Sequence, residues 1–248
     1  MTRWKGFPVV IFGCFARPEP RSYLEVYREK FGARPAIDPI EIKAVQFIIE
    51  TVRSNPNEVT LLAVGPCTNI AHAVRIAPEI VPLIKRVVYM GGAFEVPGNT
   101  TPAVEFNWWF DPEAAKICVR TPFADQLVVG LDVCEKYRFG VDIYQRIMAV
   151  ESPVTALFAA QFAERFDRDP ENERLVWDTI AAAVVIDPSL ITREKRLWID
   201  VDTGYGLDYG RSLACSGDKP LGARRARTLY DIDEERFWNL LVNLLTQP

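Results

Sequence analysis

The residues best suited to chemistry lie in a short stretch near the middle of the chain. One carboxylate, Glu105, and two amides, Asn99 and Asn107, follow an apolar segment that ends at Met90. Carboxylate and amide groups together accept and donate hydrogen bonds, as recognition of a polyhydroxylated ligand such as a sugar requires. Spacing alone also allows a plainer interpretation, in which these side chains only cap turns and helices.

The scarcity of histidine narrows the possible chemistry. His72 is the only histidine, so Ser and Cys catalytic triads and H-E-x-x-H zinc sites are excluded, and His72 itself is expected on a helix surface or in the core. The five cysteines form no C-x-x-C pair and are odd in number, which predicts reduced, mostly buried thiols in a cytoplasmic protein. Any chemistry should therefore use carboxylates, amides, aromatic rings or a hard metal ion.

Composition excludes several classes of partner. The 248 residues carry 29 Lys+Arg against 33 Asp+Glu, a net charge of −4, so a nucleic-acid partner is not expected. No apolar run approaches the roughly 18 residues of a membrane span, so a membrane partner is not expected either. The apolar stretch at 8–15 follows two basic residues, as in a signal peptide, but it lacks an A-x-A cleavage site and is better explained as a buried strand.

The elements that must position these residues alternate between strands and helices. The whole chain, 1–248, is expected to form one α/β domain, with a mostly parallel sheet flanked by helices. Apolar runs predict strands near 58–64, 86–90, 126–131, 197–201, 211–215 and 226–230. Helical periodicity and capping residues predict helices over 39–52, 70–76, 112–119, 141–150, 153–166, 175–186 and 233–245. Thr68 and Asn69 suit the N-cap of the helix at 70–76, and Asp111, followed by Pro and Glu, suits the N-cap of the helix at 112–119.

The ends of the predicted strands indicate where a ligand would bind. In open α/β sheets, ligands bind at the carboxyl ends of the strands. Three such ends carry small residues that let a ligand approach the backbone, at 65–69, 90–93 and 130–132. We therefore expect the polar residues that follow Met90 to line a site at this edge.

Several motifs resemble those of one enzyme family, the inosine/uridine-preferring nucleoside hydrolases. The segment G-P-C-T-N-I-A at 65–71 resembles the family's G-P-x-T-N-I-A sequence. Further matching motifs follow in the family's order, at 90–93, 99–102, 105–107, 111–115, 130–133, 177–183 and 186–190. The resemblance covers most of the chain and implies the nucleoside hydrolase fold.

This resemblance implies hydrolysis of the N-glycosidic bond of a ribonucleoside, with Ca²⁺ as cofactor and a small nucleoside as substrate. By position, the Thr68 carbonyl and the Asp178 carboxylate match metal ligands. Asn99, Glu105 and Asn107 match ribose-binding residues, and Met90 matches a residue packed under the sugar. At the position of Trp177, pyrimidine-accepting members of the family have a histidine, followed by the same aspartate. The Trp-Asp pair of this chain therefore resembles the purine-preferring subgroup, which implies that the indole stacks on the base.

One family motif is missing from this sequence. The family's N-terminal D-x-D-x-x-x-D-D supplies most metal carboxylates and the base that activates water, yet Asp38 is the only aspartate among the first 100 residues. The chain thus resembles an N-terminally shortened member without assigned catalytic residues. The acidic loop at 200–208 fails as an EF-hand, because Gly204 takes a ligand position and Tyr205 the place of the required glycine.

Three interpretations follow from this pattern. The chain is a purine nucleoside hydrolase whose missing aspartates come from an upstream segment or a partner, or it is a relative that binds nucleoside or ribose without turnover, or it is a gene-model fragment. A homo-oligomer is compatible with each of them.

Overall fold

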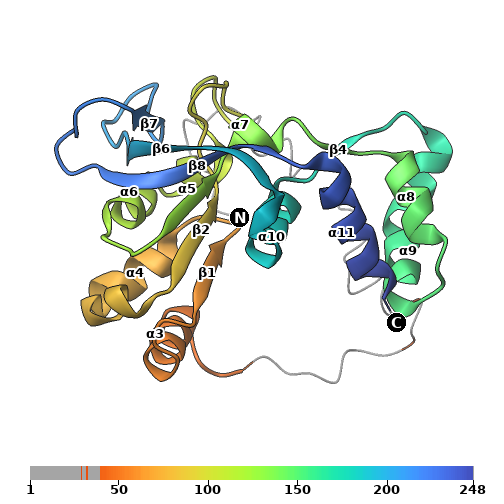
Figure 1. Cartoon of the computed structure of the whole chain (residues 1–248), viewed down its shortest axis with the longest axis horizontal. Coiled ribbons are helices and arrows are strands. Elements are labelled where there is room, and N and C mark those ends of the chain that lie inside the picture. The colour runs from red at the N-terminus through yellow and green to blue at the C-terminus, as the bar shows by residue number, and fades with distance from the viewer. Residues whose placement is uncertain (1–28, 30–31, 33–39, 248) are drawn as a thin grey trace.

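A six-stranded sheet forms the centre of the computed structural model, which describes residues 29, 32 and 40–247 (Figure 1). Its strand order is β1-β2-β3-β8-β6-β7. The strands are β1 (Thr60–Ala63), β2 (Arg86–Met90), β3 (Gln126–Val129), β6 (Ile191–Val201), β7 (Ser212–Cys215) and β8 (Arg224–Ile232). A separate pair joins β4 (Arg138–Phe139) to β5 (Arg174–Leu175).

The sheet is mixed, with a parallel part and an antiparallel edge. Strands β1, β2, β3 and β8 pair in parallel, whereas β6 pairs antiparallel with both β8 and β7. The predicted parallel sheet is therefore right for four strands. The first half of β6 is exposed and charged, as is common in antiparallel strands that keep one face in water.

Helices flank the sheet on both faces. They are α3 (Ala44–Ser54), α4 (Thr68–Ile76), α5 (Phe106–Phe110), α6 (Pro112–Arg120), α7 (Leu131–Cys134), α8 (Val141–Met148), α9 (Pro153–Arg168), α10 (Trp177–Ile186) and α11 (Glu234–Thr246). Two short 3₁₀ helices are η1 (Pro78–Leu83) and η2 (Pro188–Leu190). The prediction omitted α5, α7 and both 3₁₀ helices, because such short elements show too few turns for a periodic pattern.

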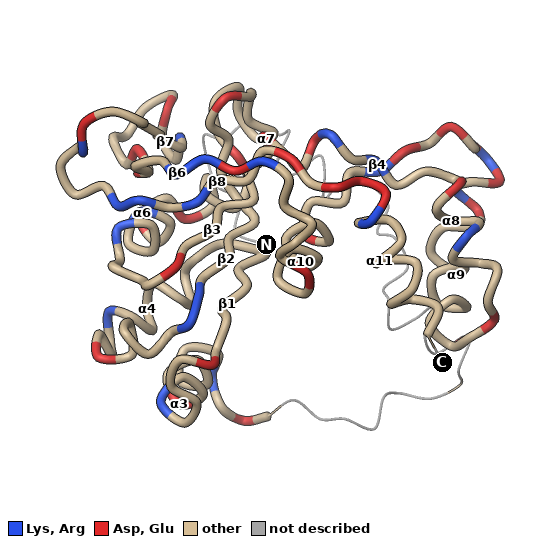
Figure 2. Tube along the Cα trace, viewed as in Figure 1, with Lys and Arg blue, Asp and Glu red and all other residues tan. Residues whose placement is uncertain are grey.

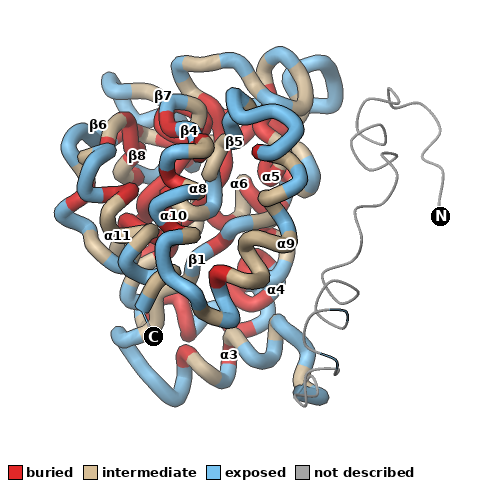
Figure 3. Tube along the Cα trace, turned by 90° about the vertical axis from the view of Figure 1, so that its right-hand side faces the viewer, coloured by how far each residue is buried: buried red, intermediate tan, exposed pale blue. Residues whose placement is uncertain are grey.

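The strands of the parallel part separate two hydrophobic cores. In β2, Val87 and Tyr89 pack into the core with α3, α4 and α6, whereas Val88 and Met90 pack into the core with α8, α10 and α11. Successive strand residues point to opposite faces, so β2 is buried on both sides. Figure 3 shows the buried residues gathered inside the described part of the molecule.

The caps of two helices decide the geometry near the predicted site. Asp111 caps α6 as predicted, since its Oδ1 accepts a hydrogen bond from the Ala114 N–H at 3.0 Å. The predicted cap at Thr68 and Asn69 is wrong, because α4 begins at Thr68 and Cys67 takes the cap position. The Thr68 hydroxyl instead donates to Asp111 Oδ2 at 2.5 Å.

Other boundaries shift by a few residues. The helix predicted over 39–52 begins at Ala44, and the strand predicted to end at Leu131 ends at Val129, where the chain turns into α7. The strand predicted at 8–15 lies outside the described residues. His72 lies exposed on α4, as predicted for a helix-surface histidine.

The described cysteines are free thiols, and three of the four are buried. Among residues 40–247, no helix combines the length and the hydropathy needed to cross a lipid bilayer.

Candidate active site

Glu105 is the central polar residue at the end of β2. It is 1% exposed, and its carboxylate accepts three backbone hydrogen bonds, from Gly92 N at 3.0 Å, Asn107 N at 2.8 Å and Trp108 N at 3.1 Å. Burial raises the pKa of Glu105, the backbone bonds oppose this shift, and the charge of Asp178 adds to it. The carboxylate therefore ties the end of β2 to α5 and keeps one acceptor position free on Oε1.

Asn107 and Met90 form one unit beside Glu105. The Asn107 amide donates to the Met90 carbonyl at 3.0 Å and lies 3.2 Å from its sulfur. Both side chains are nearly buried, at 8% and 3% exposure. This contact holds the Asn107 amide at the carboxyl end of β2, which is where sequence analysis expects a ligand.

Asn99 lies further out, in the loop between β2 and α5. It is exposed, and its Oδ1 accepts a hydrogen bond from Phe106 N at 2.9 Å. Both interpretations of this stretch therefore apply in part, because the side chains of Asn99 and Glu105 do cap local structure. The Asn99 amide nitrogen has no protein partner among the described residues and is free to donate to a ligand.

Asp132, in α7 just after β3, holds the same loop through hydrogen bonds. It is 5% exposed and accepts hydrogen bonds from Phe94 N at 2.9 Å and Glu95 N at 2.7 Å. Ser212 of β7 adds a third anchor, since its hydroxyl accepts from Ala93 N at 3.0 Å. The strand end at 130–132 was a sequence signal for Asp132, whereas nothing in the sequence indicated Ser212.

Trp177 and Asp178 are the first two residues of α10. The Trp177 indole is 38% exposed and has no aromatic partner among the described residues. Asp178 lies at the surface, yet partial desolvation raises its pKa. The helix packs against β1, β2 and α7, which brings its first turn to the ends of the central strands.

Cys134 of α7 lies close to Trp177, Glu105 and Asp178. Its sulfur lies 3.7 Å from the Trp177 carbonyl, and burial raises the pKa of its thiol, with further contributions from Glu105 and Asp178. Sequence analysis did not single out this cysteine. Its inert, buried thiol packs the first turn of α10 against the end of β3.

The residues present do not fit a calcium ion. Ca²⁺ takes about 6–8 oxygen ligands, and within the described ranges no three His, Cys, Asp or Glu side chains cluster as a metal site would. Of the two expected ligands, Thr68 uses its hydroxyl on Asp111, which leaves its carbonyl, and Asp178 supplies one carboxylate. Glu105 uses three of its acceptor positions on backbone N–H groups. No catalytic step is therefore assigned to a metal.

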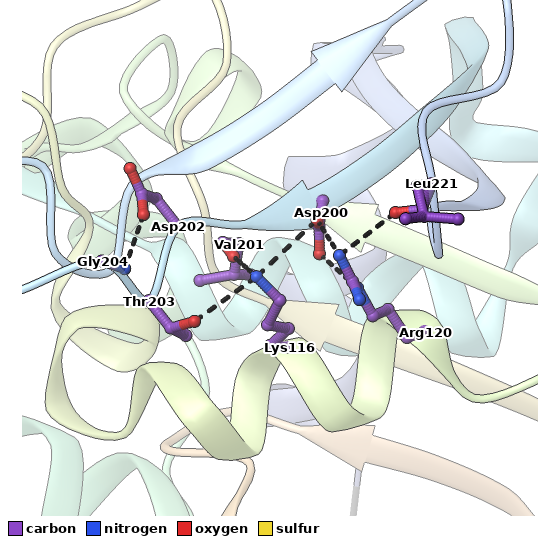
Figure 4. A network of polar contacts seen from close by, with 8 residues as sticks. All are labelled: Lys116, Arg120, Asp200, Val201, Asp202, Thr203, Gly204 and Leu221. Atoms are coloured by element: carbon purple, nitrogen blue, oxygen red, sulfur yellow. Dashed lines mark hydrogen bonds and ion pairs between the residues drawn. The ribbon is translucent and has the colours of Figure 1, made fainter.

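The acidic loop after β6 has a structural role. Asp200 accepts two hydrogen bonds from Arg120, at 2.8 and 2.5 Å, and Asp202 accepts one from Gly204 N at 2.7 Å (Figure 4). Partial burial alone would raise the pKa of Asp200, but the bonds from Arg120 and the charge of Lys116 hold it below its usual range. These carboxylates are thus engaged within the protein.

Comparison with curated proteins finds ribonucleoside hydrolases among the relatives of this chain. A pyrimidine-specific ribonucleoside hydrolase, RihA of Salmonella newport, is 32% identical over 223 residues, which are 85% of this chain and 68% of the relative. Another, RihB of Escherichia coli, is 34% identical over 203 residues, or 80% of this chain and 64% of the relative. The chain thus spans about two thirds of the length of these relatives.

Similar solved structures and a matching family model are also nucleoside hydrolases. A plant nucleoside hydrolase, PpNRh1, superposes with a TM-score of 0.77 at 26% identity, covering 94% of this chain and 76% of that one. A purine-preferring ribonucleoside hydrolase from Gardnerella vaginalis gives 0.74 at 25% identity, covering 86% and 68%. The family model described as inosine-uridine preferring nucleoside hydrolase matches residues 15–239. This chain therefore belongs to the inosine-uridine preferring nucleoside hydrolase family.

Proposed function

We propose that the site binds a purine ribonucleoside and that the reaction it serves is hydrolysis of the N-glycosidic bond, which releases base and ribose. The observation that carries this proposal is the Trp177 indole, which is exposed, has no aromatic partner within the described part of the chain, and lies at the same sheet edge as the Glu105 and Asn107 pair. A flat apolar surface beside fixed polar groups suits a ligand that joins a flat base to a sugar.

The ribose is assigned to the polar side of the site. The free acceptor position of Glu105 and the unused amide atoms of Asn99 and Asn107 are matched to ribose hydroxyls. Met90 packs beneath the sugar ring, and the nearby carboxylates favour the positive charge that develops at the anomeric carbon during glycosidic cleavage. Burial of Glu105 and Met90 keeps this side of the site rigid, so little order is lost on binding.

Base preference is the finer part of the proposal. The relatives RihA and RihB are named as pyrimidine-specific, whereas the Gardnerella vaginalis structure is named as purine-preferring. We favour purines because Trp177 stands where pyrimidine-accepting members have a histidine that could protonate the departing base, and it offers an indole for stacking instead. A two-ring base also offers the indole more stacking area than a one-ring base does.

A second candidate function is nucleoside binding without turnover. It is favoured by the lack, among the described residues, of a carboxylate cluster that would hold Ca²⁺ and activate water. In that case this chain retains the recognition half of the site. Hydrolysis would then need carboxylates from outside the described residues.

Nucleoside binding and a ribose-release assay separate these functions. We expect inosine to bind more tightly than uridine in equilibrium dialysis, and Trp177→Ala to weaken inosine binding by about 1–3 kcal/mol. The control is Trp198→Ala on β6, which removes an indole that Arg225 covers at 4.9 Å. Preference for uridine, or equal losses in both variants, would contradict the assignment of Trp177.

Release of reducing sugar from inosine, with and without Ca²⁺, tests turnover in the same samples. The chain as given is expected to hydrolyse inosine at a near-background rate, because water activation is lost without the family aspartates. Ca²⁺-dependent release by the 248-residue chain alone would show that the catalytic set has been misjudged.

The cellular setting is likewise proposed. Free thiols at Cys67, Cys118 and Cys134 agree with a reducing compartment such as the cytoplasm. A homo-oligomer stays a prediction, and sedimentation equilibrium would test it.

A further inference from the structure

An open cavity of about 910 Å³ lies on the α4 and α6 side of the sheet. Its walls come from the end of α4, from η1, from the outer face of α6 and from the loop after β6. Both charged and apolar side chains line it. This volume lies within the range of sites that bind small molecules.

The cavity is separate from the candidate active site, although the same two helices reach both. Helix α4 begins at Thr68, near the strand ends, and contributes Val74 and Arg75 to the cavity at its other end. Seven residues of α-helix span roughly 10 Å. None of the residues matched to ribose, base or metal lines the cavity.

The cavity combines an apolar floor with a cationic rim. Side chains of Val81, Ile117 and Pro122 provide apolar surface. Arg75 is exposed and has no hydrogen-bond or ion-pair partner among the described residues, so its guanidinium is free to bind a ligand. Figure 2 shows basic residues on α6 and along the adjacent β6.

Lys116 and Arg120 supply positive charge that the protein only partly neutralises. Lys116 donates to the Val201 carbonyl at 2.8 Å and lies 3.8 Å from Asp200, which Arg120 also contacts (Figure 4). Two cations therefore share one carboxylate. The Nη1 group of Arg120 has no hydrogen-bond acceptor among the described residues and lies against the Gly222 backbone, so Arg120 contributes its charge at the edge of the cavity.

The acidic groups around the cavity do not balance this charge. Among the described residues, Glu113 is the only carboxylate that lines it, and both oxygens of Glu113 accept hydrogen bonds from Tyr209, at 2.9 and 2.7 Å. Asp200 does not line the cavity but pairs with Lys116 and Arg120. Two carboxylates, Glu113 and Asp200, are therefore counted against the three cations of Arg75, Lys116 and Arg120. One positive charge thus remains for a ligand.

We propose that this cavity is a second binding site, which takes a small organic anion composed of a phosphate or carboxylate group attached to an apolar ring. The anionic group contacts Arg75 within the positive field of Lys116 and Arg120, and the ring lies on the apolar floor between η1 and α6. A ligand that has only the anionic group, or only the ring, makes half of these contacts and should bind more weakly.

Calorimetric titration of the full chain with phenyl phosphate tests this site, with inorganic phosphate as a probe that has the charge but not the ring. We expect saturable binding of phenyl phosphate, weaker binding of inorganic phosphate, and a loss of affinity as salt rises. Arg75→Gln should weaken phenyl phosphate binding about fivefold, as expected for one exposed charge. The matched control is Lys85→Gln, which neutralises an exposed cation outside the cavity and should leave binding unchanged.

Amide NMR shifts locate the bound probe independently of these variants. Binding should shift the Thr121 and Thr203 amides at the cavity and leave the Asn107 amide at the candidate active site unchanged. The proposal is overturned if phenyl phosphate does not saturate, if inorganic phosphate binds equally well, or if both variants lose affinity alike. In that case the basic residues in the last turns of α4 and α6 only compensate the helix carbonyl ends.

Discussion

Glu105 offers a sharp test of how the candidate active site is built, because its carboxylate is buried and serves three backbone N–H groups. Glu105→Gln keeps the shape of the side chain but replaces one carboxylate oxygen with an NH₂ group. The oxygen that accepts from both Gly92 and Trp108 is best retained, so the NH₂ group then faces the Asn107 N–H. One buried donor loses its acceptor in this variant.

The size of the effect follows from these contacts. A buried donor left without an acceptor costs about 1–3 kcal/mol, so Glu105→Gln should lower the unfolding free energy by about that amount. Glu105→Ala removes all three acceptors together with the cap of α5, and should cost about 3 kcal/mol or more. The matched control is Glu58→Gln, which changes an exposed carboxylate and should stay within about 0.5 kcal/mol.

The pH dependence gives the prediction a second, independent readout. Burial raises the pKa of Glu105 above its ordinary value of 4.5, so the folded chain holds this proton more tightly than the unfolded chain does. The resulting stabilisation is fully present below about pH 4.5 and is lost as the pH rises through the raised pKa. Glutamine has no such proton, so the difference between wild type and Glu105→Gln should shrink as the pH rises.

Urea unfolding of the wild type and the variants, repeated across the acidic range, measures both effects. The m-values should stay equal, which would show that the folded states remain equally compact. The reasoning is refuted if Glu105→Gln and Glu58→Gln have the same small effect. It is also refuted if the wild-type stability rises with pH relative to Glu105→Gln, because that would mean a lowered pKa.

Three further predictions concern the metal, the loop and the helix cap. Calorimetry should detect weak Ca²⁺ binding or none, since one carboxylate and one carbonyl fall short of the ion's ligand number; a micromolar site would contradict this. Asp132→Ala should lose about 1–3 kcal/mol and speed hydrogen exchange at the Phe94 and Glu95 amides, whereas unchanged exchange would show that the loop is held elsewhere. Asp111→Ala should lower stability by about 1–2 kcal/mol in thermal unfolding, because it removes the α6 cap and the Thr68 contact; a loss below about 0.5 kcal/mol would count against both contacts.

Local sequence pattern was enough to predict most of the helices and strands. The strand β2 has its predicted bounds, and Asp111 caps α6 as its Asp-Pro-Glu sequence indicates. These features depend on neighbours in the chain, through side-chain periodicity and helix-end hydrogen bonds. The family motifs at the strand ends likewise indicated the sheet edge at which Glu105 and Asn107 lie.

Tertiary structure alone decided the direction of β6 and the partners of the polar groups. The sequence of β6 predicts a strand but does not say that it runs antiparallel to β8. Ala93 and Ser212 are 119 positions apart, and the contact of Cys134 with Trp177 also joins distant segments. Such pairings form only when the whole sheet brings these segments together. The sequence thus determined which polar groups follow the strands at this sheet edge, while long-range packing determined which of their atoms are already bonded within the protein.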